Sequence, residues 1–224
     1  MELLKEELRY EKKWVYLEKN KNFLLSCLKK GGFFFINSFP IRSVNNLYYD
    51  TKDLKSLTDN LDGVSFRQKL RVRWYGDFYN AKNLFVERKI KKNQLGLKKI
   101  KKIDFSIDFK NFKNIEKLNN YIETNFSLLK DPIKPILFNR YKRIYTVSKI
   151  FPDVRCTLDF NLQSFVYNPI IGPKLFKSYP YLILEIKYPS NKDFLVKKVL
   201  NFYNLKRISK SSKYVTMYLN EKFF

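Results

Sequence analysis

Hydrophobic and polar residues alternate along much of this 224-residue chain. Alternation with a period of two indicates β-strands, because successive side chains of a strand point to opposite faces. The clearest example is Val64 to Tyr75, in which apolar and basic residues alternate. The pattern predicts about eight strands, over residues 8–17, 44–50, 64–75, 84–90, 97–105, 135–148, 154–166 and 181–188.

Between these strands, other stretches show the spacing of helices. One helix ends at Gly31-Gly32, which is a strong stop signal, and a short one covers 53–60. Longer amphipathic helices are predicted over 112–128 and 192–203, and a further segment, 211–219, closes the chain. No repeat or flexible linker divides the sequence. We therefore expect a single domain over 1–224, a β-rich α+β fold with mostly antiparallel strands.

The polar positions of the strands are occupied by charged residues rather than by neutral ones. In the strand 64–75, Arg67, Lys69, Arg71 and Arg73 share one face, and the opposite face is apolar apart from Gln68. Five other strands repeat this division. Their charged faces carry Arg9, Glu11 and Lys13; Glu87 and Lys89; Arg140 and Lys142; Arg155 and Asp159; and Glu185 and Lys187.

Two arrangements could hold such strands. The charges could face solvent around a sandwich core, or the sheet could close into an eight-stranded tunnel barrel with charges inside and helices packed outside. The amphipathic helices need an apolar surface to cover, and the charged faces are rich in arginine, whose guanidinium fork suits phosphate. We therefore predict the closed barrel. Carboxylates on these faces could hold Mg²⁺ or Mn²⁺, although simple ion pairing would explain at least half of them.

Composition excludes several kinds of chemistry. The chain has no histidine and only two cysteines, which rules out a histidine-dependent triad and a four-cysteine zinc site and fits a reducing compartment. With 45 Lys+Arg against 21 Asp+Glu, the net charge of +24 predicts an anionic partner. An A+T-rich genome would also explain many of the lysines, so their placement is more informative than their number. The charged start and the lack of a long apolar run predict a cytoplasmic protein without a signal peptide or transmembrane segment.

Several short motifs resemble a known family in their order along the chain. They are RYEKKW at 9–14, LYYDT at 47–51, RQKLRVRWYG at 67–76, FVERK at 85–89, NRYKR at 139–143, VRCTLDFNL at 154–162, LEIK at 184–187 and SSKY at 211–214. Together they resemble the VTC domain, the catalytic domain of polyphosphate polymerases, within the triphosphate tunnel metalloenzyme superfamily. Arg9 stands where relatives with an ExExK signature have their first glutamate. This departure suits the VTC branch better than the hydrolytic CYTH branch.

The resemblance implies roles for individual residues. It implies a catalytic set that acts on the phosphates, consisting of Arg71, Arg73, Lys89, Arg155 and Lys213. Further phosphate-binding residues are expected at Lys13, Arg140, Lys187 and Ser212, at Lys98 or Lys99, and at Arg67 and Lys69 on the same strand face as Arg71. Glu185 matches the metal-binding glutamate, and Glu11 and Glu87 are the other candidate ligands for Mn²⁺ or Mg²⁺.

The implied activity is transfer of the γ-phosphate of ATP to a growing polyphosphate chain, without a protein nucleophile. ATP and inorganic polyphosphate or pyrophosphate are the expected partners, and no nucleic acid is expected. Two alternatives stay open: a tripolyphosphatase or nucleoside or RNA 5′-triphosphatase that uses water as acceptor, and a polyanion-binding module without activity. The lysine-rich surface also leaves room for peripheral association with a membrane or an export partner, and the sequence does not indicate an oligomeric state.

Overall fold

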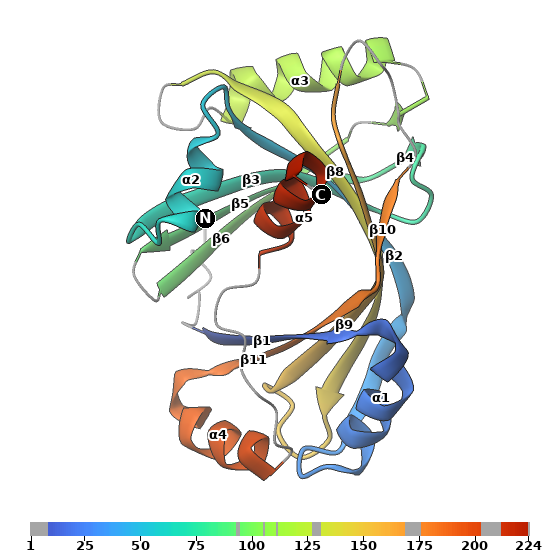
Figure 1. The fold of residues 1–224 in the computed structure, drawn as a ribbon, viewed down its shortest axis with the longest axis vertical. Coiled ribbons are helices and arrows are strands. Elements are labelled where there is room, and N and C mark those ends of the chain that lie inside the picture. The colour runs from blue at the N-terminus through green and yellow to red at the C-terminus, as the bar shows by residue number, and fades with distance from the viewer. Residues whose placement is uncertain are drawn as a thin grey trace. The chain divides into compact units, whose positions relative to one another are not determined.

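The computed structural model describes residues 9–92, 95–104, 106–110, 112–126, 131–168, 176–202 and 212–223. The chain divides into two compact units (Figure 1). Unit 1 comprises residues 1–42, 142–162 and 179–211, and unit 2 comprises 43–141, 163–178 and 212–224. Each unit is treated by itself below. The single domain expected over 1–224 stays a prediction.

Most of the strands belong to one hydrogen-bonded sheet, whose order is β1-β11-β9-β8-β2-β3-β5-β6, with β10 on β9. A separate two-stranded sheet joins β4 and β7. The strands are β1 (Arg9–Leu17), β2 (Phe35–Thr51), β3 (Phe66–Tyr75), β4 (Asn80–Ala81), β5 (Leu84–Lys92), β6 (Leu95–Ile103), β7 (Ile107–Asp108), β8 (Ile133–Ser148), β9 (Arg155–Val166), β10 (Lys177–Tyr179) and β11 (Tyr181–Pro189). The registers of β1 with β11, β11 with β9, β2 with β3, β3 with β5 and β5 with β6 are all antiparallel. The β-rich, mostly antiparallel α+β fold is therefore confirmed.

The prediction of a closed barrel is wrong for the strands described. The strand order starts at β1 and ends at β6, and these two strands are not paired with each other. Alternation along a strand specifies which side chains share a face. Closure depends in addition on strand tilt and on the stagger between strands, which this pattern does not encode.

In unit 1, helices cover the apolar face of the sheet. Its helical elements are η1 (Glu18–Asn20), α1 (Lys21–Lys30), η2 (Ser190–Lys192) and α4 (Asp193–Phe202). Leu24 and Leu28 of α1 and Val196 of α4 join one buried cluster with strand residues such as Trp14 and Leu184. Because strand side chains alternate, the charged residues of β1, β9 and β11 lie on the other face.

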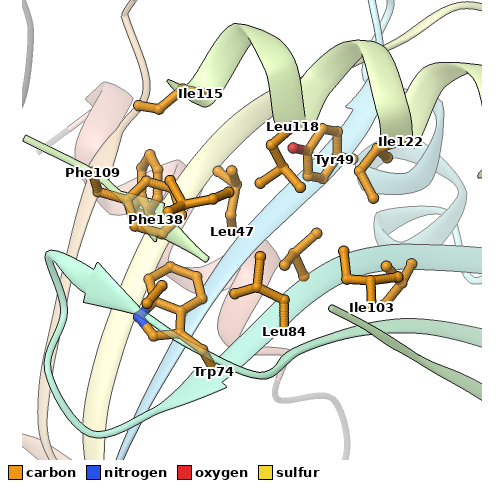
Figure 2. Close-up of a cluster of buried hydrophobic side chains, with 14 of the residues drawn as sticks. Leu47, Tyr49, Trp74, Leu84, Ile103, Phe109, Ile115, Leu118, Ile122 and Phe138 are labelled. Atoms are coloured by element: carbon orange, nitrogen blue, oxygen red, sulfur yellow. The ribbon is translucent and has the colours of Figure 1, made fainter. Parts of the chain in front are cut away.

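In unit 2, α3 (Phe112–Phe126) covers the apolar face in the same way, and the unit also contains α2 (Lys55–Leu61) and α5 (Lys213–Phe223). Leu118 and Ile122 point from α3 toward the strands that carry Leu47 and Leu84 (Figure 2). Trp74 is fully buried in the same cluster. Burial of a large apolar side chain contributes roughly 1.5–3 kcal/mol, so this cluster holds α3 on the apolar side of β2, β3 and β5.

Two elements differ from the sequence-based expectation. The strand predicted over 44–50 is the end of a longer strand, β2, whose first part is exposed on both faces and so shows no alternation. The closing segment 211–219, to which no type was given, is largely helix α5. In the described residues, no helix is both long enough and apolar enough to cross a membrane.

Candidate functional site

The polar face of unit 1 carries four charged residues that alternate in sign. In the antiparallel register, Lys13 of β1 lies opposite Glu185 of β11, and Glu11 lies opposite Lys187. Lys13 Nζ lies 2.5 Å from Glu11 Oε1 and 3.2 Å from Glu185 Oε2. Lys187 Nζ lies 2.6 Å from Glu185 Oε1 and 3.8 Å from Glu11 Oε2. The structure therefore brings together two predicted phosphate-binding lysines and two predicted metal-binding glutamates.

The two carboxylates keep Lys13 charged. Burial alone would lower the pKa of Lys13, but the negative charges of Glu185 and Glu11 and their hydrogen bonds outweigh it and raise the pKa well above its usual value. Lys13 is thus a fixed positive charge, and Glu185 is itself buried.

β9 continues this face. Arg155 lies opposite Lys187 and is exposed, and Thr157 lies opposite Glu185 with a buried hydroxyl that has no hydrogen-bond partner in the described structure. Asp159, which we had considered as a metal ligand, instead binds Arg143, whose Nη2 lies 2.7 Å from Asp159 Oδ2. The carboxylate of Asp159 is thus explained by an ion pair with a neighbouring arginine rather than by metal binding.

Three candidate metal ligands were expected, and two of them suit a divalent ion. Within the described ranges, no cluster of three or more acidic or sulfur side chains could hold a metal on its own. Mg²⁺ and similar ions are nevertheless often bound by one or two carboxylates together with substrate phosphates and water. Glu11 and Glu185 fit that mode of binding. The ammonium group of the half-exposed Lys187 contacts both carboxylates, and a metal ion would take its place. Glu87 does not fit that mode, because its two oxygens already contact three cationic side chains.

The polar face of unit 2 is centred on this glutamate. Arg71 donates from Nε and Nη2 to Glu87 Oε2, at 2.8 and 2.6 Å. Arg73 Nη1 and Lys98 Nζ lie 3.4 and 2.9 Å from Glu87 Oε1. Burial alone would raise the pKa of Glu87, but Arg71, Arg73 and Lys98 outweigh it and hold the pKa far below its usual range. One buried negative charge thus stands among three positive ones.

A row of lysines crosses the same face. Lys69 of β3 lies opposite Lys89 of β5, which lies opposite Lys98 of β6. In the adjoining row, Arg67 lies opposite Lys91. Like charges directly opposite one another destabilise a sheet, so an anion bound along this row would relieve the repulsion between its lysines.

Helix α5 lies against this polar face and contributes to it. Ser212 Oγ, just before the helix, accepts a hydrogen bond of 2.7 Å from Lys69 Nζ. Lys213 Nζ lies 4.9 Å from the ring centre of Tyr141. Tyr214 stacks on Tyr48 and donates a hydrogen bond of 2.6 Å to Asp50. The SSKY motif therefore places Ser212 next to a strand lysine that was predicted to bind phosphate.

Sequence reasoning missed the buried polar groups that orient Arg73. Asn46 Oδ1 accepts from Arg73 Nε at 2.9 Å, and Asn46 Nδ2 donates to Asn139 Oδ1 at 2.8 Å. Tyr141 completes the surroundings, with its hydroxyl 3.3 Å from Arg73 Nη2. Asparagine is uncommon in strands. Two asparagines in strand-like segments were therefore a signal that this face is a polar site.

Three predicted phosphate-binding residues lie apart from the rest. Of the two alternatives Lys98 and Lys99, Lys98 lies on the face of Glu87, whereas Lys99 lies opposite Arg88 on the face that carries Gln68. Arg140 is on the apolar side of β8, with its guanidinium carbon 4.0 Å from the ring centre of Phe176. Arg67 lies on the charged face of β3, and its Nη1 donates a hydrogen bond of 2.7 Å to the carbonyl oxygen of Val64. The roles of these residues stay predictions.

Comparison with known proteins identifies the fold first. A candidate adenylate cyclase from Vibrio parahaemolyticus superimposes with a TM-score of 0.53 at 12% identity, over 94% of this chain and 98% of that one. A candidate adenylyl cyclase from Hippeastrum, described as having a dominant triphosphatase activity, gives a TM-score of 0.48 at 14% identity, over 96% of each chain. The PH1819 protein from Pyrococcus horikoshii gives 0.49 at 11% identity, over 93% and 98%. At these identities, the match to the Vibrio protein is evidence for the fold alone.

The family follows from the sequence. Residues 4–220 match the VTC domain, and the chain belongs to this family. The resemblance to the VTC domain seen in the short motifs is thereby confirmed. No curated protein matches the chain closely enough to supply a more specific assignment. Family and fold together support an enzyme that acts on phosphate compounds with a divalent metal ion.

Proposed function

We propose that this protein is a polyphosphate polymerase, which transfers the γ-phosphate of ATP to the end of an inorganic polyphosphate chain. The observation that carries the proposal is the row formed by Lys69, Lys89 and Lys98 next to Arg71 and Arg73. These cations come from neighbouring strands, and three of them, Arg71, Arg73 and Lys98, share the single carboxylate of Glu87. A linear polyanion with identical charged groups is the ligand that such a row compensates best.

The chemical step needs charge neutralisation and alignment rather than a protein nucleophile. An oxygen of the terminal phosphate of the chain attacks the γ-phosphorus of ATP, the bond from that phosphorus to the β-γ bridging oxygen breaks, and ADP leaves. Arg71 and Arg73 neutralise oxygens of the transferred group, because they are held in place by Glu87 and Asn46. Lys89 and Lys213 provide further positive charge, and nothing in this step requires recognition of the adenine base.

Unit 1 has a complementary role in the proposal. Lys13 and Arg155 bind phosphate oxygens, and Glu11 and Glu185 hold the divalent ion. A divalent ion such as Mn²⁺ or Mg²⁺ held by these two carboxylates would supply positive charge against the phosphoryl oxygens. Lys187 contacts both carboxylates in this structure and so holds them in place.

The test is product analysis. Purified protein incubated with ATP and Mn²⁺ is expected to make polyphosphate long enough to resolve on a gel, in amounts that match the ADP released. Formation of only ADP and free phosphate would refute the proposal, because water would then be the acceptor. Glu185→Ala separates catalysis from simple binding. It should abolish the metal-dependent reaction and leave binding of tripolyphosphate intact or stronger, whereas a binding module would show no reaction in either form.

A further inference from the structure

Three turns of unit 1 meet at one end of its sheet. The turn after α1 contacts the turn between β8 and β9, because the amide of Lys149 donates to the carbonyl of Phe34 at 3.2 Å. In addition, the rings of Phe33 and Phe151 lie 6.3 Å apart. Lys192, just before α4, has its Nζ 4.8 Å from the ring centre of Phe151 and forms an ion pair with Asp153. We refer to residues 29–34, 149–153 and 190–198 as the loop surface.

Helix α4 also lies directly beside the first of these turns. A Cβ atom at Gly32 would be 3.5 Å from Val199 Cγ1, which is ordinary van der Waals contact. The outer sides of α1 and α4 therefore border the same surface, since both helices pack on the same apolar cluster. Figure 1 shows α1, α4 and the β8–β9 turn at this end of unit 1.

Each of the three segments of the loop surface exposes one large apolar side chain. Phe34 is 48% exposed, Ile150 51% and Phe194 82%. Phe34 also has a φ of 45°, a conformation that a bulky residue adopts only at a cost of roughly 1–3 kcal/mol. The fold thus holds an aromatic ring at the surface in a strained turn, where a smaller residue or glycine would be more stable.

Lysines surround these apolar side chains. The loop surface contains Lys29, Lys30, Lys149, Lys192, Lys197 and Lys198, and its acidic residues are Asp153 and Asp193. Both aspartates are neutralised, Asp153 by Lys192, and Asp193 by Lys197 at 2.6 Å and Lys12 at 3.7 Å. Lys29, Lys30, Lys149 and Lys198 have no acidic partner among the residues described. The surface therefore offers free positive charge around protruding apolar groups.

We infer that the loop surface binds anionic lipid bilayers, with Phe34, Ile150 and Phe194 inserted between the lipids and the lysines at the headgroups. A bilayer meets both requirements, because it has negative charge at its surface and apolar chains beneath it. Polyphosphate and nucleic acid meet only the first. A folded protein partner would need pockets for three side chains that protrude from separate turns, whereas a bilayer deforms around them.

The experiment is co-sedimentation with vesicles of phosphatidylcholine, with and without added phosphatidylserine. The wild-type protein should sediment with the anionic vesicles only, and added salt should weaken the binding. The double variant Ile150→Ser/Phe194→Ser should bind at least about tenfold more weakly, because it removes most of the apolar area that enters the bilayer. Its rate of reaction on ATP in the absence of vesicles should be unchanged.

A matched control is available in the same unit. Phe39 on β2 is 53% exposed and lies outside the loop surface, so Phe39→Ser makes the same chemical change elsewhere and should leave vesicle binding unaltered. Thermal unfolding of each variant shows that it is folded. The inference would be overturned if Phe39→Ser lost as much vesicle binding as the double variant, or if the double variant bound as well as the wild type. It would also be overturned if the wild-type protein bound neutral and anionic vesicles equally. Loss of vesicle binding on addition of tripolyphosphate at constant ionic strength would overturn it as well, because the polar faces would then be the site of contact.

Discussion

The polar faces of the two units rest on the same alternation of residues, but they balance charge differently. In unit 1, two carboxylates share two lysines, and each lysine contacts both acids. In unit 2, a single carboxylate, Glu87, is shared by Arg71, Arg73 and Lys98, with Lys69 and Lys89 beside them. Among these contacts, unit 1 thus pairs two acids with two lysines, whereas unit 2 sets one acid among three cations.

This difference suggests a division of work. Two acids that contact a half-exposed lysine can accept a cation together with phosphate oxygens. Several cations around one acid can bind phosphate directly, without a metal. Substitutions in unit 1 should therefore change metal dependence, and substitutions in unit 2 should change phosphate affinity and stability.

The largest effect is expected from Glu87→Gln. It leaves three buried or half-buried cations without their counter-charge, which should destabilise the fold by about 3–5 kcal/mol. Because the pKa of Glu87 is depressed in the folded state, its contribution is complete at neutral pH. The difference in free energy of unfolding between wild type and variant should begin to shrink below about pH 4, where a glutamate in the unfolded chain takes up its proton. It should continue to shrink as the pH approaches the lower pKa that Glu87 has in the folded protein. Urea unfolding at several pH values measures this.

Tripolyphosphate provides the control for that variant. An anion that binds among the orphaned cations should stabilise Glu87→Gln more than it stabilises the wild-type protein, by mass action. Equal increases in melting temperature would mean that phosphate does not bind on this face, and the comparison between the units would then lose its basis.

The next effect is expected from Arg71→Ala, which should lower the rate of phosphate transfer by about 10²–10³-fold, as removal of one preorganised charge at a transition state does elsewhere. Arg88→Ala is the matched control. Arg88 lies on the opposite face of β5, with its Nε 2.7 Å from Gln68 Oε1. Steady-state kinetics with ATP should show a normal rate for Arg88→Ala. A similar decrease in both would point to a general loss of structure.

A third experiment compares the acids of the two units. Glu185→Gln should raise the Mn²⁺ concentration needed for half-maximal activity by about 10–100-fold. Glu87→Gln should leave that concentration nearly unchanged, since Glu87 is already saturated by cations. Metal titrations of both variants at saturating ATP measure this. If the two respond alike, the assignment of metal binding to unit 1 alone is wrong.

The smallest effect concerns two neighbouring lysines. Lys98 contacts Glu87 on the charged face, whereas Lys99 lies opposite Arg88 on the other face. Lys98→Ala should raise the KM for ATP a few-fold. An interaction of one half-exposed charge contributes up to about 1 kcal/mol, which corresponds to a change of this size. Lys99→Ala should have no effect, and an effect from Lys99 alone would mean that the register of β5 with β6 differs in solution.

The faces of most strands could be predicted from the sequence because they depend on local alternation, whereas Arg140, expected on a charged face, lies on the apolar side of β8. Arg71 and Arg73 share a face, as expected, and so do Glu185 and Lys187. The choice between Lys98 and Lys99 could not be made, because it depends on how β5 pairs with β6 across a turn. Register is set by contacts between strands, so it is invisible in the pattern of either strand alone.

Long-range polar contacts were equally out of reach. Asp50 receives hydrogen bonds from the amides of Ser56 and Leu57 at the start of α2, and from Tyr214 far along the chain. An aspartate before a short helix predicts capping, but its second partner is specified only by the docking of α5. Closure into a barrel failed as a prediction for a related reason, since it concerns the outermost strands, and nothing within either strand determines it.

The position of α5 has a consequence for the order of folding. Tyr214 is separated from Asp50 by 164 residues and Ser212 from Lys69 by 143, so these contacts close very long loops. Contacts with such sequence separation form slowly and late. The strands of unit 2 over 44–141 can pair before this helix arrives, and during that interval Lys69 meets solvent anions instead of Ser212. Polyphosphate in the surrounding solution could therefore reach the polar face of unit 2 before the fold is complete. The folding rate of this protein should then depend on the concentration of polyphosphate.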